Sequence, residues 1–322
     1  MTTKQRLLTL LEQNKGQYFS GEELAQRFCV SRAAVWKAIQ ALRQEGYAID
    51  AATNRGYCLS LQGDILSAEG VGKYLRCPQL KPTVLPCVDS TNTRLRQLAD
   101  QGAEEGTAIL ACQQTQGRGR MGRSFYSPGG TGLYLSLLLR PRAYDPQQAT
   151  DLTALAAVAM CQAMEEVFDR HPQIKWVNDL LLEGKKICGI LTEGAFSVES
   201  GALEYLVLGV GVNMTAPEDG FPEELASIAG SLLETGEDDG KNRLAAEFLN
   251  RFWEGYLHPE NRQFVEQYRR RSMVIGKQVT AHWGSESRPA LVLGIDDACR
   301  LLVRWESGET QTLSYGEISV KV

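Results

Sequence analysis

The chain has 322 residues, 43% hydrophobic and 23% charged, which excludes a disordered protein and favours two or three folded domains over a single core. Its net charge of −5 by itself argues against binding to nucleic acid. The charge is unevenly distributed, however: residues 1–62 carry +3 and the rest −8, as in a small basic module joined to an acidic body. No apolar run is long enough to span a membrane and the polar first residues lack a signal-peptide stretch, so we expect a cytoplasmic protein without a membrane partner.

The first 62 residues predict a helix-turn-helix followed by a hairpin. A first helix is expected over Lys4–Gln13. Ser20 and Glu23 can form a capping box that starts a second helix, and Ser31 can cap a third. Two helices joined by a tight turn make a helix-turn-helix, and the alternation of apolar residues over Gly46–Leu61 predicts a wing after it.

The polar side of the third helix and the tip of the wing are the expected DNA contacts. A recognition helix fits the major groove, where arginine and glutamine side chains reach base edges and a hydroxyl contacts phosphate. The residues in question are Ser31, Arg32, Lys37, Gln40, Arg43 and Arg55. A three-helix interaction domain whose charges form a solvated face is the alternative, and the following wing favours DNA binding.

Residues 67–272 predict a second domain of mixed helices and strands, which follows a loose connector from Gln62 to Gly70. Its expected strands are Thr83–Val88, Ala108–Cys112, Gly132–Leu139, Ile174–Leu182, Lys186–Phe196 and Leu203–Asn213, and its expected helices are Thr91–Gln101, Thr150–Phe168 and Arg243–Tyr268. Two connectors, Glu183–Lys185 and Val198–Ala202, are short enough for hairpins. Antiparallel neighbours indicate an α+β fold with a mixed or antiparallel sheet, and not a doubly wound one.

A glycine- and arginine-rich loop follows the strand that ends at Cys112. Its glycines match the G-x-G-x-x-G pattern of dinucleotide-binding folds: Gly117, Gly119 and Gly122. Such a loop must open a helix, but here the chain continues through Pro128 into a strand, which excludes a Rossmann site and NAD. Three arginines alternate with the glycines: Arg118, Arg120 and Arg123. They can wrap a small anion such as phosphate, and a nonspecific nucleic-acid loop would instead predict repeated basic segments.

A second polar cluster begins at Lys175 and includes Asn178 and Asp179, with Lys186 after a short turn. A hairpin over this segment would place Asp179 and Lys186 near opposite ends.

Beyond residue 273 the pattern changes to short strands, expected over Gln278–Trp283, Pro289–Ile295, Leu301–Trp305 and Thr310–Leu313. These predict a small SH3-like barrel over residues 273–322.

Together, the dispersed motifs resemble those of bifunctional biotin–protein ligases, also called biotin operon repressors. The motifs are Ser20–Leu24, Ser31–Val35, Ser90–Asn92, Gln114–Arg123, Lys175–Leu180, Lys186–Leu191, Gly209–Asn213, Gly294–Asp296 and Gly316–Ser319. The resemblance implies a multidomain α+β protein: a winged helix-turn-helix over 1–62, a central domain like that of class II aminoacyl-tRNA synthetases and lipoate ligases over 67–272, and an SH3-like barrel over 273–322.

Three positions depart from the pattern of that family. Cys29 replaces a glycine in the helix-turn-helix, Val177 replaces a proline, and Phe125 replaces a tryptophan. The last two remove no charge or polar contact and are compatible with an active site. A left-handed backbone is costly for a residue with a Cβ, so we expect the turn at Cys29 to differ slightly from that of the family.

The resemblance further implies an ATP-dependent ligase that makes biotinyl-5′-AMP and transfers biotin to a lysine of a biotin carboxyl carrier protein. It also implies a repressor of biotin genes that binds operator DNA as a homodimer when biotinyl-AMP is bound. The implied biotin-binding residues are Ser90, Thr91, Asn92, Gln114, Gly117, Arg118, Gly119, Arg120 and Lys186. For ATP or the adenylate they are Arg118, Arg120, Arg123, Asn178 and Asn213, and for catalysis Lys186, Arg118, Arg120 and Asp179. Asp179 either holds Mg²⁺ or acts on the incoming amine.

Two other functions fit parts of the sequence. One is a transcription factor that senses a small anion and has lost catalysis; the presence of Lys186, Asp179 and the loop arginines argues against it. The other is a lipoate-type ligase, against which the full arginine loop and the winged helix argue. The eight cysteines are scattered without a C-x-x-C pair and there are three histidines, so we expect reduced thiols and no zinc. Cys112 and Cys188 are expected to be structural, because the reaction needs no thiol nucleophile.

Overall fold

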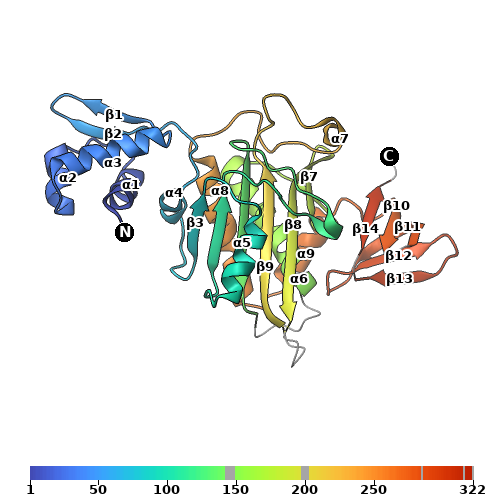
Figure 1. The fold of residues 1–322 in the computed structure, drawn as a ribbon. Coiled ribbons are helices and arrows are strands. Elements are labelled where there is room, and N and C mark those ends of the chain that lie inside the picture. Colours follow the sequence, from blue (N-terminus) through green and yellow to red (C-terminus); the bar gives the residue numbers. More distant parts are fainter. Residues whose placement is uncertain (142–148, 197–202, 284–285, 315, 321–322) are drawn as a thin grey trace.

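The computed structural model describes residues 1–141, 149–196, 203–283, 286–314 and 316–320, which form an N-terminal, a central and a C-terminal unit in a row (Figure 1). The predicted connector Val198–Ala202 lies outside the described residues. In the described part, no helix is long and apolar enough to cross a membrane.

The N-terminal unit is a helix-turn-helix with a two-stranded wing. It comprises α1 (Thr3–Gln13), α2 (Gly21–Phe28), α3 (Arg32–Gln44), β1 (Ile49–Ala52) and β2 (Gly56–Leu59), with the two strands antiparallel. The Ser31 hydroxyl caps α3 as predicted. The Ser20 hydroxyl accepts from the Glu23 N–H, which is half of the predicted capping box. A complete box is found instead at α1, between Thr2 and Gln5.

The turn between α2 and α3 corrects one prediction. Cys29 has φ 55° and ψ 48°, which is the left-handed conformation that a glycine would adopt. The expectation of a different turn at this position was therefore wrong. The packing of α2 against α3, through Leu24 and Ile39 among others, holds the cysteine in this conformation.

The connector after the wing is not loose, contrary to the prediction. The Gly63 N–H donates to Asp238 Oδ1 over 2.8 Å. Asp64 Oδ1 accepts from the Lys241 N–H over 2.7 Å, and the Lys241 ammonium lies 3.4 Å from Asp64 Oδ2. A short helix, α4 (Ala68–Gly72), then begins at Ser67, whose hydroxyl caps it. The connector is thus bound along its length to the start of α8 (Gly240–Leu257).

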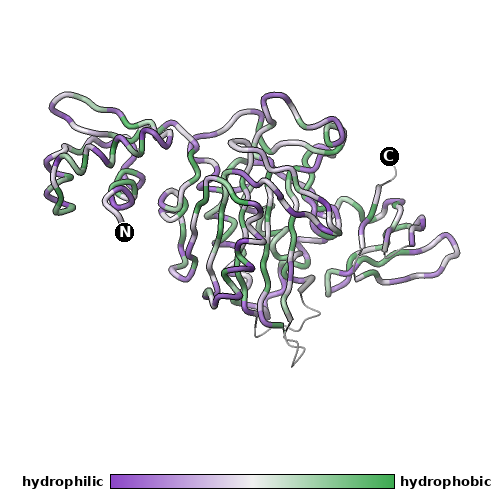
Figure 2. Tube along the Cα trace, in the orientation of Figure 1, coloured by the Kyte–Doolittle hydropathy of each residue, from purple (hydrophilic) through white to green (hydrophobic). Residues whose placement is uncertain are grey.

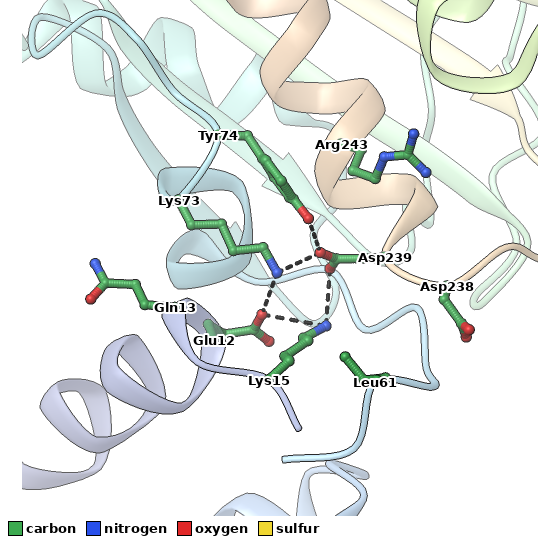
Figure 3. A pocket seen from close by; sticks show the side chains of 9 residues that line it. All are labelled: Glu12, Gln13, Lys15, Leu61, Lys73, Tyr74, Asp238, Asp239 and Arg243. Carbon is green, nitrogen blue, oxygen red and sulfur yellow. Dashed lines mark hydrogen bonds and ion pairs between the residues drawn. The ribbon is translucent and has the colours of Figure 1, made fainter. Parts of the chain in front are cut away.

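A cluster of four charged side chains joins the N-terminal unit to the central one; we call it the junction cluster (Figure 3). Glu12 lies in the last turn of α1 and Lys15 just after it, and Lys73 and Asp239 come from the central unit. Lys73 Nζ lies 2.9 Å from Glu12 Oε2 and 2.5 Å from Asp239 Oδ2. Lys15 Nζ lies 3.4 Å from Glu12 and 3.2 Å from Asp239, and the Tyr74 hydroxyl donates to Asp239 over 2.6 Å.

The central unit is built on a seven-stranded mixed sheet. The strands are β3 (Lys81–Leu85), β4 (Thr107–Ala111), β5 (Gly132–Leu139), β6 (Gln173–Lys175), β7 (Asp179–Leu182), β8 (Lys185–Phe196) and β9 (Leu203–Asn213), in the spatial order β3-β4-β5-β9-β8-β7-β6. Only the β3–β4 pair is parallel among these neighbours. The mixed sheet of an α+β domain is therefore confirmed.

Helices cover both faces of this sheet (Figure 1). On one face lies α5 (Thr91–Asp100), whose Leu95 packs with Ile109 and Val207. On the other lie α6 (Ala149–Phe168) and α8, together with α9 (Gln263–Arg271). Strand β5 is buried at every position and is mostly apolar, in keeping with the green central strands of Figure 2; Ser136 is a buried polar exception.

Two predicted elements of the central unit are each divided in two. The strand expected over Ile174–Leu182 bends after β6, and β7 begins only at Asp179; the Trp176–Val177 peptide bond between them is cis. The helix expected over Arg243–Tyr268 ends at Leu257 and resumes as α9. Pro259 explains this break, since it follows the end of α8 and cannot continue a helix.

The C-terminal unit is a five-stranded antiparallel sheet. Its strands are β10 (Gln278–Trp283), β11 (Glu286–Ile295), β12 (Leu301–Trp305), β13 (Thr310–Leu313) and β14 (Glu317–Val320), in the order β13-β12-β11-β10-β14. Within the described residues β13 and β14 stand at opposite ends of this order and are not paired with each other, so the sheet is open. Val279, Val292 and Val303 are fully buried in its core.

Candidate functional site

A cavity of about 730 Å³ opens where the arginine loop, the β7–β8 hairpin and the C-terminal unit meet. Most of the predicted ligand-binding residues line it: Ser90, Thr91, Asn92, Gln114, Arg118, Gly119, Arg120, Arg123, Asn178, Asp179, Lys186 and Asn213. Gly117 is the one predicted residue that does not. A Cβ there would lie 2.3 Å from the Phe125 carbonyl oxygen, so Gly117 allows the two arms of the loop to pack together.

The arginine loop folds as an irregular hairpin. The Phe125 N–H donates to the Gly117 carbonyl over 2.8 Å, and the Gly119 N–H donates to the Arg123 carbonyl over 2.7 Å. The only helical turn is the 3₁₀ segment Arg120–Gly122, and the next residue is extended. No α-helix follows the glycines, in agreement with the rejection of a Rossmann site.

One wall of the cavity is a hydrogen-bonded polar cluster at the start of α5. The Thr91 N–H donates to Gln114 Oε1 over 2.9 Å. The Ser136 hydroxyl donates to Asn92 Oδ1 over 2.6 Å and lies 2.8 Å from Thr91 Oγ1. Ser136 is fully buried and was not predicted, because a single serine in the apolar strand β5 gives no signal in the sequence.

Glycines of β9 let this wall and the loop approach the sheet. A Cβ on Gly209 would lie 2.1 Å from Asn92 Oδ1, and a Cβ on Gly211 would lie 2.5 Å from the Phe125 ring. The Phe125 ring also meets Tyr134 edge-on, with 6.4 Å between the ring centroids. Phe125, which replaces a tryptophan of the family, thus packs its ring against Gly211 of β9.

Lys186 and Asp179 form an ion pair in the cavity, with 2.7 Å between Nζ and Oδ1. Lys186 is opposite Leu181 near the turn and Asp179 is at the far end of β7, as expected of opposite ends of a hairpin, yet their side chains meet. Asp179 is opposite Gly189 in the strand register, but a bulge after Leu180 brings Lys186 within reach of the carboxylate. The Arg120 guanidinium donates to Asn178 Oδ1 over 3.1 Å. A loop arginine is therefore fixed to the same hairpin.

The C-terminal unit also reaches the cavity, a contribution that the residue predictions missed. His282, Glu317, Ile318 and Ser319 are among the lining residues. Glu317 Oε2 lies 2.7 Å from the Arg123 guanidinium, so an ion pair connects the end of the arginine loop to β14. Arg123 and Glu317 are far apart in the sequence and meet only in the folded protein. No spacing pattern in the sequence could therefore have predicted this pair.

The predicted DNA-binding residues lie at the start of α3, along α3 and on the wing, and they differ in exposure. Arg32 and Lys37 are exposed, and Arg55 at the wing tip lies over the Tyr18 ring at 4.0 Å. Arg43 is partly buried and both its Nε and Nη2 donate to the Ile49 carbonyl, so its guanidinium supports the wing. Trp36 was not predicted, yet it is 53% exposed on the same helix.

Comparison with known proteins extends this picture to the whole chain. A model of the Biotin/lipoate A/B protein ligase family matches residues 84–213, an HTH domain model matches residues 3–58, and a Biotin protein ligase C terminal domain model matches residues 274–321. The chain is 34% identical to the bifunctional ligase/repressor BirA of Bacillus subtilis, over 95% of both chains. The chain belongs to the family of bifunctional biotin–protein ligases and repressors.

Other relatives agree with this membership. The bifunctional ligase/repressor BirA of Escherichia coli is 30% identical, with 99% of this chain and 98% of that one covered. The biotin protein ligase from Aquifex aeolicus, whose structure was solved in complex with biotin and ATP, is 28% identical and superposes with a TM-score of 0.62. That match covers 74% of this chain and 98% of the Aquifex chain.

The thiols near the family's site are not suited to nucleophilic chemistry. Burial raises the pKa of the Cys112 thiol and, much more strongly, that of the Cys188 thiol. Neither residue lines the cavity. A buried thiol with a raised pKa is not a thiolate at neutral pH, which supports the structural role expected of both cysteines.

Within the described residues, no group of three or more histidine, cysteine, aspartate or glutamate side chains could hold a metal ion. Asp179 is the one carboxylate on the β7–β8 hairpin that faces the cavity, and its partner is the Lys186 ammonium. Magnesium commonly keeps several waters and binds one or two carboxylates plus substrate phosphates. The donor set therefore fits Mg²⁺ only as an ion held chiefly by the phosphates of a nucleotide.

Proposed function

We propose that the chain activates biotin with ATP to give biotinyl-5′-AMP and then transfers biotin to a lysine of a biotin carboxyl carrier protein. The observation that supports this best is the cavity itself, which brings the arginine loop, the Lys186–Asp179 pair and a polar wall around Thr91 and Gln114 together. These groups match the needs of a carboxylate, a nucleotide phosphate and a polar ring system.

Biotin has a polar ureido ring, an apolar bicycle and tail, and a carboxylate. A pocket for it needs a few aimed polar groups within a mostly apolar wall. Thr91 and Gln114 offer the polar groups, as do Ser90 and the backbone near Arg118. The apolar wall is formed by residues of β8, β9 and the loop: Phe125, Ile190, Leu191 and Val210.

In the first half-reaction, a carboxylate oxygen of biotin attacks the α-phosphorus of ATP. The bond to that phosphorus forms, the bond from it to the bridging oxygen breaks, and pyrophosphate leaves. Positioning and positive charge are the main requirements, because two anions must approach each other. Lys186, Arg118, Arg120 and Arg123, which all line the cavity, supply that charge. Mg²⁺, when bound with ATP, neutralises phosphate oxygens.

Lys186 is proposed to lie between the biotin carboxylate and the α-phosphate. Its ion pair with Asp179 supports this role, since the carboxylate, 2.7 Å from Nζ, fixes the position of the ammonium among the residues that line the cavity. In the second half-reaction the amine of an acceptor lysine attacks the biotinyl carbonyl and AMP leaves. Asp179 is the carboxylate placed to take the proton of that amine, and we favour this role over that of a metal ligand.

The N-terminal unit is proposed to repress biotin genes by binding operator DNA through Ser31, Arg32, Lys37, Gln40 and Arg55. Arg43 contributes indirectly, since its guanidinium supports the wing. Biotinyl-AMP is proposed to favour a homodimer that places two such units on a two-part operator. The proposed boundaries are residues 1–62 for the first unit, 67–272 for the second and 273–322 for the third. The second unit is proposed to share the fold of class II synthetases. The third is proposed to be an SH3-like domain that closes over ATP and binds the carrier protein.

The direct test is incubation of the purified chain with ATP, Mg²⁺ and either biotin or lipoate, followed by mass spectrometry of the small molecules. We expect biotinyl-AMP and pyrophosphate with biotin, and no lipoyl-AMP with lipoate. Lipoyl-AMP in place of biotinyl-AMP would establish a lipoate-type ligase. If neither adenylate forms while either acid still changes DNA binding, the chain is a sensor without catalysis.

A further inference from the structure

Glu193 lies on β8 and does not line the cavity itself. It contacts two residues that do, Arg118 and Asn92. One carboxylate oxygen, Oε1, lies 2.9 Å from the Arg118 guanidinium. The other, Oε2, accepts a hydrogen bond from Asn92 Nδ2 over 2.8 Å. A single carboxylate therefore bridges the arginine loop and the start of α5.

The contact with Arg118 is the only ion pair of that arginine within the described part of the chain. Arg118 stands between Gly117 and Gly119, and its side chain is 43% exposed. Glycines on both sides give the backbone a wide choice of conformations, so an unanchored arginine there would be mobile. The ion pair with Glu193 removes much of this freedom before any ligand arrives.

On its other side, Glu193 completes a chain of hydrogen bonds along the polar wall. Asn92 is buried, donates to Glu193 and accepts from the Ser136 hydroxyl. Ser136 in turn lies 2.8 Å from Thr91, which binds Gln114 through its N–H. A shift of the Glu193 carboxylate would therefore disturb both the loop and the polar wall.

A second cation, Arg96, lies further from Glu193, with 3.7 Å between the charged atoms. The side chains of Arg96 and Arg118 are similarly exposed, at 46% and 43%, so the two ion pairs differ chiefly in distance. An exposed ion pair at this distance contributes little. Arg96 does not line the cavity, so it provides a matched control for the pair with Arg118.

We propose that Glu193 is a positioning residue that fixes Arg118, and with it the first arm of the arginine loop, against the polar wall. The ligand pocket is thus formed before biotin binds. Preorganisation of this kind improves binding because less freedom is lost when the ligand enters. The proposal rests on the proposed function only where biotin is named as the ligand; the contact between the loop and Glu193 is independent of it.

The first experiment follows biotin-dependent pyrophosphate release at saturating ATP in Glu193→Gln. The amide keeps an oxygen that can accept from Asn92 but loses the charge that holds Arg118. We expect the KM for biotin to rise about tenfold or more while kcat changes less than about threefold, since a charged hydrogen bond contributes in this range. Arg96→Met should leave both constants unchanged, and Glu193→Asp should recover part of the affinity.

The second experiment needs no ligand and no activity. Trypsin is added to the ligand-free protein, and cleavage after Arg118, Arg120 and Arg123 is followed by mass spectrometry. We expect several-fold faster cleavage in Glu193→Gln than in the wild type or in Arg96→Met, with unchanged cleavage elsewhere. If the wild type makes no biotinyl-AMP, the proposed function fails while this arm still decides the role of Glu193.

Three outcomes would overturn the inference. The first is a loop that is cleaved at the same rate in Glu193→Gln and in the wild type. The second is a kcat that falls while the KM for biotin stays the same, because that result assigns Glu193 to the chemical step. The third is tighter biotin binding in Glu193→Gln, which would make the carboxylate a competitor of the ligand for Arg118.

Discussion

At the scale of single residues, contacts with other elements hold the cations of the candidate site in defined positions. Lys186 is paired with Asp179, Arg120 with Asn178, and Arg123 with Glu317. None of the three partners belongs to the arginine loop; they lie on or next to β7 and on β14. The tertiary structure therefore fixes the positions of these positively charged side chains, which the loop alone would not do.

Removal of one such charge should slow activation far more than it destabilises the protein. For Lys186→Ala or Arg120→Ala we expect biotinyl-AMP formation to fall by roughly two orders of magnitude, because a charged hydrogen bond lost in a transition state costs about 2–4 kcal/mol. The measurement is the initial rate of pyrophosphate release. Lys81→Ala, at an exposed lysine paired with Glu104 at the start of β3, is the control and should behave as the wild type. Near-normal rates in both site variants would refute the mechanism.

Cys29 provides a prediction about stability. Its left-handed backbone is unfavourable for a residue with a Cβ by about 1 kcal/mol, and glycine avoids this cost. Cys29→Gly should therefore slow amide hydrogen exchange in α2 and α3 of the full chain. Cys29→Ala keeps the Cβ and removes the thiol, so it should show no such slowing. Equal protection in the two variants would mean that the thiol, and not the backbone, determines the effect.

At the scale of elements, long periodic segments were predictable and bends were not. Strand β5 and helix α6 agree with their predictions to within one residue, because each presents a long apolar pattern to the core. The bend between β6 and β7 has no such signature. The break at Pro259 was visible in the sequence, but the apolar register of Arg243–Tyr268 continued across it.

The same distinction applies to the candidate site. Motifs of adjacent residues, such as Ser90–Asn92 and the arginine loop, were found because their residue types are unusual together. Glu193 and Ser136 were missed because each is an isolated polar residue within an apolar or mixed strand, and Glu317, although part of the motif Gly316–Ser319, was given no role in the site. Their roles follow from which strands are neighbours in the sheet, and a sequence does not state this directly.

The glycine strand β9 provides a test at this scale. In Gly209→Ala the new Cβ would lie 2.1 Å from Asn92 Oδ1, so Asn92 must move and its contacts in the polar wall must change. We expect a loss of about 1–3 kcal/mol in stability and a weaker affinity for biotin. Thermal unfolding and a biotin titration measure the two effects. Gly236→Ala, where a Cβ meets no atom within 4 Å, should leave both unchanged. An affinity that survives in Gly209→Ala would show that the close approach to Asn92 is not needed.

At the scale of the whole molecule, the junction cluster attaches the DNA-binding unit to the ligase. Burial raises the pKa of Asp239, but hydrogen bonds from Lys73, Tyr74 and Asn242 outweigh it and bring the pKa to about 2. Burial lowers the pKa of Lys73, but its hydrogen bonds with Asp239 and Glu12 outweigh it and raise the pKa above the usual value of 10.5. Both groups are therefore charged at neutral pH.

These shifts define a pH window for the junction. Because the folded pKa of Asp239 is lowered from 3.8, its contribution of about 2 kcal/mol is present above about pH 4 and is lost as the pH falls towards 2. Because the folded pKa of Lys73 is raised, its contribution is complete below about pH 10 and is lost above its folded pKa. We expect hydrogen exchange in α1 and α4 to quicken below pH 4 beyond the change seen in β12. Exchange that rises equally in the three elements would contradict this.

A substitution tests the junction at neutral pH. Lys73→Met leaves Glu12 and Asp239 close together with only Lys15 between them, and their side chains are 2% and 8% exposed. Removing one partner of a buried pair costs about 3–5 kcal/mol, so we expect the N-terminal unit to detach and the radius of gyration from small-angle X-ray scattering to increase. Lys4→Met, which breaks an exposed pair with Glu45 inside the N-terminal unit, is the control. An unchanged scattering curve for Lys73→Met would show that other contacts suffice to hold the two units.

The central claim is the transfer of biotin to a protein lysine, and one measurement tests it most directly. A biotin carboxyl carrier domain is incubated with the chain, ATP, Mg²⁺ and biotin, and its intact mass is recorded. We predict a mass increase of one biotinyl group, located on the acceptor lysine, and none when that lysine is replaced by arginine or when the ligase has Lys186→Ala. An unmodified carrier in the presence of active wild-type protein and freshly formed biotinyl-AMP would contradict the account.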